Sequence, residues 1–164
     1  MNKLLLIVTG VVVLTGAGLA GQSKRDSIQG AWQVVEVTVT GPEARTITIP
    51  EPRPNLIVFT GRHYSRVEIH AEGPLSVPAD IGRATADELR AAWGPFVGEA
   101  GTYELAGNLI TMRPIVAKNP AAMAPGAFVT YSYKLAGDTL WVTFQKNQNG
   151  PIVHPVTVKA VRVE

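Results

Sequence analysis

The feature that most constrains the fold is a succession of short β-rich runs, which fills the chain from residue 30 to its end. Valine, threonine and aromatic side chains dominate these runs, and such residues suit the pleated surface of a strand. Glycine, proline, asparagine and aspartate separate the runs and favour turns. The pattern predicts strands over residues 31–40, 45–49, 55–60, 63–70, 109–115, 139–145 and 154–163.

Two of the predicted hairpins, TYELAGN over residues 102–108 and SYKLAGD over residues 132–138, share the pattern Tyr-x-Leu-Ala-Gly followed by Asn or Asp. Strands joined by consecutive hairpins form a meander, and a meander of about eight to ten strands protects its edges most simply by closing on itself. We therefore predict an all-β fold, an antiparallel up-and-down barrel with one short helix inserted between strands. A small barrel of this kind can hold one ligand.

The inserted helix is predicted over residues 85–93. Thr85 and Glu88 have the spacing of a capping box, in which each side chain binds a free backbone N–H of the first turn. Leu89, Trp93 and Phe96 follow at helical spacing. We expect these apolar side chains to plug one end of the barrel. In the alternative, the helix is a lid that moves on nearby glycines.

The first twenty residues have the three parts of a secretory signal: a positive start at Lys3, an apolar run, and small residues up to Ala20. We predict a signal peptide over residues 1–20, a flexible polar lead-in over residues 21–27 and the barrel domain over residues 28–164. The protein is then exported, to the periplasm or beyond, with no stable membrane insertion after cleavage. An uncleaved membrane anchor is the alternative.

Charge and residue content exclude several classes of function. The net charge is only +2 and no long run of Lys or Arg occurs, so we expect no nucleic-acid partner. The absence of cysteine excludes disulfides and thiolate metal sites. His63, His70 and His154 are not spaced as metal ligands, and no nucleophile elbow or phosphate loop is present. We predict neither metal nor cofactor.

The start of the first predicted strand, Gly30-Ala31-Trp32, resembles the Gly-x-Trp signature that opens the lipocalin barrel. With the FTGRHYSR run over residues 59–66, residues 28–163 are similar to the bacterial lipocalin-like domain family, whose fold is a calycin-type β-barrel. The resemblance implies that Trp32 plugs the closed end of the barrel. It also implies that an arginine of the last strand, here Arg162, packs over that tryptophan.

Alternation along residues 63–70 places four polar side chains on one face of the strand, namely Tyr64, Arg66, Glu68 and His70. This row forms either a solvated outer surface or a polar wall inside a cavity. If the row faces inward, Arg66 would hold a carboxylate, and Glu68 with Tyr64 would position a polar group of the ligand.

Five further residues complete the candidate ligand-binding set. Arg113 is expected at the rim of the barrel, where it would be a second anion anchor. The aromatic residues Tyr103, Tyr131, Tyr133 and Trp141 would form a binding wall or pack in the core. In a barrel, the core and the pocket share the same space.

Export, barrel size and this residue set lead to the hypothesis of a non-enzymatic protein that binds a small hydrophobic or amphipathic molecule with a polar or anionic group. One alternative is a barrel enzyme of the cyclase or isomerase type. It requires a buried carboxylate with a raised pKa, for which the candidates are Glu68, Glu104 and Glu36. Another alternative is a filled barrel that binds partners through its loops over residues 49–54 and 147–155.

Overall fold

The computed structural model describes residues 27–49, 54–70, 75 and 77–164. The predicted signal peptide, most of the predicted lead-in and part of the loop over residues 49–54 lie outside the described residues. The strands are β1 (Gly30–Val39), β2 (Arg45–Thr48), β3 (Asn55–Phe59), β4 (His63–Ile69), β5 (Phe96–Ala106), β6 (Leu109–Ala117), β7 (Val129–Ala136), β8 (Thr139–Asn147), β9 (Gly150–Pro151) and β10 (Val156–Arg162). The helical elements are η2 (Ile81–Arg83), α1 (Ala86–Trp93) and η3 (Pro120–Met123).

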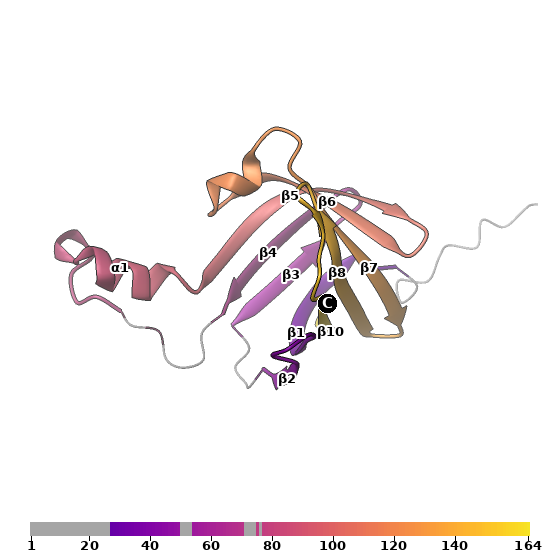
Figure 1. Ribbon diagram of the computed structural model, residues 1–164, viewed down its shortest axis with the longest axis horizontal. Helices are drawn as coiled ribbons and strands as arrows, with labels where there is room; N and C mark the ends of the chain where they lie inside the picture. The colour runs from indigo at the N-terminus through magenta and orange to yellow at the C-terminus, as the bar shows by residue number, and fades with distance from the viewer. Residues whose placement is uncertain (1–26, 50–53, 71–74, 76) are drawn as a thin grey trace, which may run out of the picture.

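Eight of the ten described strands form a closed antiparallel barrel (Figure 1). Around the barrel, β10, β1, β3, β4, β5, β6, β7 and β8 each pair with the next strand, and β8 pairs with β10 to complete the ring. The short strand β2 pairs with β1, and the short strand β9 pairs with β8; neither is part of the ring. The predicted all-β, up-and-down barrel is therefore confirmed.

Strand β5 is longer than the prediction, which placed the strand from residue 102 onward. It begins at Phe96 because it pairs with β4 over the whole length of that strand, from His63 opposite Thr102 to Ile69 opposite Phe96. The first part of β5 is rich in glycine and alanine, which have low strand propensity. Its conformation comes from the neighbouring strand.

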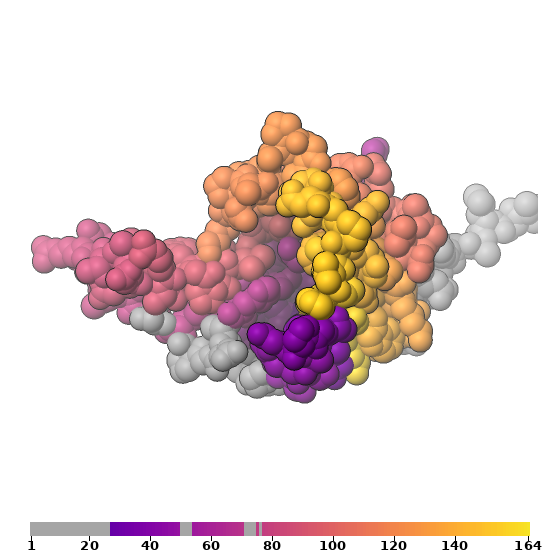
Figure 2. Space-filling view, viewed as in Figure 1, coloured from indigo at the N-terminus to yellow at the C-terminus, as the bar shows by residue number. Residues whose placement is uncertain are grey.

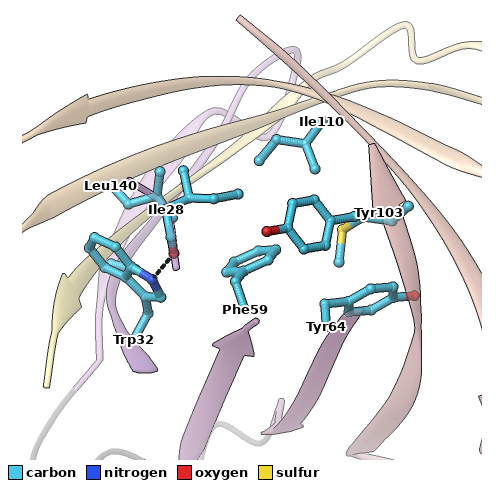
Figure 3. Packing of buried hydrophobic residues seen from close by; sticks show 9 residues of the cluster. Ile28, Trp32, Phe59, Tyr64, Tyr103, Ile110 and Leu140 are labelled. Carbon is cyan, nitrogen blue, oxygen red and sulfur yellow. Dashed lines mark hydrogen bonds between the residues drawn. The ribbon is translucent and has the colours of Figure 1, made fainter. Parts of the chain in front are cut away.

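The closed end of the barrel is built around Trp32, which is fully buried (Figure 3). Its indole Nε1 donates a hydrogen bond to the carbonyl oxygen of Ile28 at 2.7 Å. The guanidinium of Arg162 lies 4.2 Å from the centre of the Trp32 ring and donates to the carbonyl oxygens of Gln29 and Ser27. The expected packing of Arg162 over Trp32 is thus present, and it ties the segment before β1 to the last strand.

A cluster of buried side chains stacks on Trp32 and fills this half of the barrel. Phe59 and Tyr103 meet edge to face, with ring centres 5.3 Å apart (Figure 3). The hydroxyl of Tyr103 donates to the carbonyl oxygen of Thr60 at 2.6 Å, which satisfies its polar end. Ile110 and Leu140 complete the cluster from β6 and β8.

Gly30 is required at the start of β1, and its replacement by alanine is expected to destabilise the protein by about 2–4 kcal/mol. Its φ is +132°, and a Cβ there would collide with the carbonyl oxygen of Glu164 and crowd the guanidinium of Arg162. Urea denaturation would measure the loss. Gly61→Ala is the control, because a Cβ at Gly61 meets nothing within 4 Å. Equal stability of the two variants would contradict this account.

The expectation that α1 plugs the barrel is wrong. The helix has the predicted capping box of Thr85 and Glu88 and ends at Gly94, yet it lies at one end of the molecule, away from the barrel strands (Figure 1). Along α1, all of which is described, no residue is buried, and Trp93 is 51% exposed. Lys118 holds the helix end by donating to the carbonyl oxygens of Trp93 and Phe96.

Helix α1 ends at Trp93, and β5 begins at Phe96, opposite Ile69 at the end of β4, so α1 lies beyond the end of this strand pair (Figure 1). Helical periodicity identified an apolar stripe but contains no information on what that stripe contacts. Among the described residues, no helix is long and apolar enough to cross a membrane.

Candidate functional site

The barrel encloses a cavity of about 310 Å³ above the Trp32 cluster. Most of its lining is apolar and comes from strands all around the barrel, including Val34, Ile57, Phe59, Val142, Phe144 and Val158. Figure 2 shows the molecule hollowed between the indigo β1–β2 segment and the yellow and orange segments of the C-terminal half. The volume is at the lower end of the range for small-molecule pockets, about 300–1,000 Å³.

The polar face of β4 points into the barrel. Tyr64 is 2% exposed and Glu68 is 9% exposed, whereas Val67 on the opposite face is 45% exposed. Arg66, Glu68 and His70 all line the cavity. Of the two alternatives for this row of side chains, the structure therefore has the polar inner wall.

These side chains form one connected set of ion pairs and hydrogen bonds. The Nε of Arg66 lies 3.1 Å from Oε1 of Glu99, and its Nη1 lies 3.8 Å from Oε1 of Glu68. The Arg66 Nε–H is not aligned for a hydrogen bond, so the contact with Glu99 is an ion pair. The hydroxyl of Tyr64 donates to the same Glu99 oxygen at 3.0 Å. Its ring lies at the edge of the core cluster with the hydroxyl pointing away from Phe59 (Figure 3).

Burial alone would raise the pKa of Glu68, but the hydrogen bond from His70 and the charge of Arg66 outweigh it and hold the pKa below its ordinary value of 4.5. Glu68 is therefore ionised at neutral pH. Since an ionised carboxylate only accepts, Nε2 of His70 carries the proton in their 2.7 Å hydrogen bond. The His70 side chain is 61% exposed and marks the open end of the cavity.

The pKa shifts of three further groups of the wall, Tyr64, Tyr131 and Arg66, favour their ordinary charge states. Burial, followed by the negative charge of Glu99, raises the pKa of Tyr64, so its phenol stays neutral and donates. Burial also raises the pKa of Tyr131. For Arg66, burial would lower the pKa, but Tyr131, Glu99 and Glu68 reverse this and raise it. The cavity lining thus contains the charged guanidinium of Arg66 beside the ionised carboxylate of Glu68.

The structure divides the nine candidate ligand-binding residues into three groups. Four line the cavity: Arg66, Glu68, His70 and Tyr131. Three do not line the cavity: Tyr64 and Tyr103 belong to the buried core cluster, and the partly buried Tyr133 packs against that cluster. The last two, Arg113 and Trp141, do not line the cavity.

The positions of Arg113 and Trp141 correct two expectations. The Arg113 side chain is 50% exposed and lies 3.9 Å from Glu104 on the outer surface, so it is no anion anchor at the mouth. Leu140 and Val142 on β8 face the cavity, so Trp141 between them faces out, where it lies beneath the amine of Lys134. The sequence showed two faces for each strand without showing which one was internal.

Two important residues of the site were absent from the prediction. Glu99 on β5 is the main ion-pair partner of Arg66. Glu99 and the inward-facing Tyr103 are four residues apart on the same strand and therefore share a face, and this alternation could have identified Glu99. Asn55 lines the cavity and continues the pairing of β3 with β1 through its side chain. It accepts from the backbone N–H of Val34 at 2.6 Å and donates to the carbonyl oxygen of Val34 at 3.2 Å.

The carboxylates do not meet the requirement set for a barrel enzyme. Glu68 is in the cavity, but its pKa is lowered, which makes it a poor proton donor at neutral pH. Glu104 is exposed on the outside, and Glu36 does not line the cavity. Within the described ranges, no group of three or more histidine and carboxylate side chains could hold a metal ion.

No protein family matches the sequence, and no curated protein is detectably similar to it. The structure is similar to that of an uncharacterized protein from Bacteroides eggerthii. The two share 11% sequence identity and a TM-score of 0.44, over 83% of this chain and 99% of the other.

Proposed function

We propose that this chain is an exported lipocalin-like protein that binds a small, mostly apolar molecule with one polar group inside its barrel. The observation that carries the proposal is the cavity of about 310 Å³, which combines an apolar wall with polar side chains from β4 on one side. Such a combination is typical of a small-molecule site, in which apolar surface provides affinity and a few polar groups set orientation.

Two further observations support binding over the alternatives. A filled interaction module is expected to have a packed interior, whereas Val142 and Phe144 here line a cavity of about 310 Å³. An acid–base enzyme needs a carboxyl group with a pKa near neutrality, and the pKa of Glu68 is shifted the other way. The contact of Trp32 with Arg162 supports the lipocalin-like assignment.

The proposal predicts that protein purified under native conditions carries a small molecule. Organic-solvent extraction followed by mass spectrometry should find a compound in a near-stoichiometric amount. Val142→Phe, which fills the cavity, should lose that compound. Val161→Phe is the matched control, because Val161 neighbours Ala160, which lines the cavity, and does not line it itself. Equal retention by the two variants, or an empty extract together with no binding of any apolar probe, would refute the proposal.

A further inference from the structure

The charge balance of the cavity wall is the feature that says most about the ligand. Arg66 lies between two carboxylates, Glu99 at 3.1 Å and Glu68 at 3.8 Å. Among the residues that the structure describes, the other charged or titratable side chains in contact with this set are His70, Tyr64 and Tyr131. One arginine faces two carboxylates, so the wall is negative with a neutral His70 and balanced with a protonated one. In neither state is it positive.

The guanidinium of Arg66 is therefore already paired with the carboxylates of the wall. Its side chain is 24% exposed, and its charge is directed at Glu99 and Glu68. A ligand carboxylate bound to Arg66 would place a third anion in this low-dielectric wall, next to two that cannot move away into water. Like charges held a few ångströms apart in such surroundings repel strongly.

The group that is open to a ligand is the carboxylate of Glu68. Within the described part of the chain, its Oε2 accepts from His70, and the ion-pair partner of its Oε1 is Nη1 of Arg66, at 3.8 Å, which is too long for a hydrogen bond. Glu68 lines the cavity, so Oε1 can accept a hydrogen bond from a bound molecule. An ammonium group would provide this oxygen with a hydrogen-bond donor that carries a positive charge. Such charge-assisted hydrogen bonds are stronger than those between neutral groups.

We propose that the cavity selects cationic amphiphiles, namely small molecules with an apolar body and a protonated amine that binds Glu68, and that it discriminates against carboxylates. The inference rests on the proposed function, because it assumes that the cavity binds a ligand. It reverses the expectation that Arg66 would hold an anion. The amine lies against Glu68 at the side of the cavity near His70, and the apolar body lies along Ile57, Val142 and Phe144.

The test is a comparison of decylamine, decanol and decanoate, which share an apolar chain and differ in the head group. Isothermal titration calorimetry near neutral pH, below the concentration at which each compound aggregates, would give the three affinities. We expect decylamine to bind at least about tenfold more tightly than decanoate, with decanol between them. Decanol or decanoate binding as tightly as decylamine would overturn the inference and leave the proposed function intact. Binding of none of the three would overturn both.

Glu68→Gln provides the second arm of the test. The variant keeps the shape of the side chain and removes the charge, so decylamine affinity should fall by at least about tenfold while decanol affinity changes little. Glu104→Gln is the matched control, because Glu104 is 74% exposed on the outer surface. Circular dichroism would confirm that both variants are folded. Unchanged decylamine affinity in folded Glu68→Gln would overturn the assignment of Glu68.

Discussion

Replacing Arg66 by methionine is expected to lower the free energy of unfolding by about 3–5 kcal/mol at neutral pH. The substitution keeps a side chain of similar length but leaves Glu99 and Glu68 without their cation. The side chains of both carboxylates are only 11% exposed, so water cannot replace the lost charge. Urea denaturation of the wild-type protein and the variant would measure the difference.

The loss of unfolding free energy caused by Arg66→Met should depend on pH in a defined direction. The pKa of Glu68 is lowered in the folded wild-type protein, in part by Arg66, so this contribution to stability is present above the ordinary value of 4.5 and is lost as the pH falls below it. Without Arg66, a protonated carboxyl is favoured in the folded state. The gap between wild type and variant should therefore narrow as the pH is lowered through this region.

The matched control is Arg113→Met. Arg113 pairs with Glu104 on the exposed surface at 3.9 Å, and such pairs contribute about 0–1 kcal/mol. We expect Arg113→Met to lose little stability, and the difference in stability between this variant and the wild-type protein should not change with pH. If Arg66→Met were no less stable than Arg113→Met, the ion pairs of the cavity wall would not have the structural role described above.

Trp32→Ala is expected to destabilise the protein by about 3–5 kcal/mol. The side chain is fully buried, so its removal leaves a cavity at the closed end. It also leaves the carbonyl oxygen of Ile28 without its 2.7 Å hydrogen bond and Arg162 without the ring on which it packs. Chemical denaturation followed by far-ultraviolet circular dichroism would measure the loss without depending on tryptophan fluorescence.

Trp141→Ala is the matched control for Trp32→Ala. Trp141 faces away from the cavity, and its described partner is the amine of Lys134 at 5.5 Å from the ring centre. A cation–π contact at a partly exposed site is worth about 0.5–1 kcal/mol. The two substitutions remove the same side chain, so similar losses would contradict the assignment of Trp32 as the closed-end plug.

Local features of the chain were sufficient to predict most of the elements. The hairpin glycines at Gly107 and Gly137 and the capping box at Thr85 each act within a few residues, and all appear in the structure. The partnership of Trp32 with Arg162 was predicted from resemblance, and the structure shows the contact.

The interior of the site could be predicted only in part. Alternation grouped Tyr64, Arg66 and Glu68 on one face of β4, but a polar row of this kind is more often a solvated surface. The row faces inward because Glu99 on β5 lies directly opposite Arg66 and forms an ion pair with it. That pairing depends on the alignment of two strands about thirty residues apart, and no local pattern contains it.

The sequence by itself determined most of the strands and their hairpin order, because propensity, turn chemistry and capping act between near neighbours in the chain. The role of Trp32 at the closed end was expected from the resemblance to the lipocalin-like family. Tertiary structure alone decided which faces turn inward, that α1 lies outside the barrel, and that Arg66 is neutralised by Glu99 and Glu68. Those outcomes depend on the burial of charge and on strand register, since a charged side chain enters a barrel only when the closed sheet brings its partners to it.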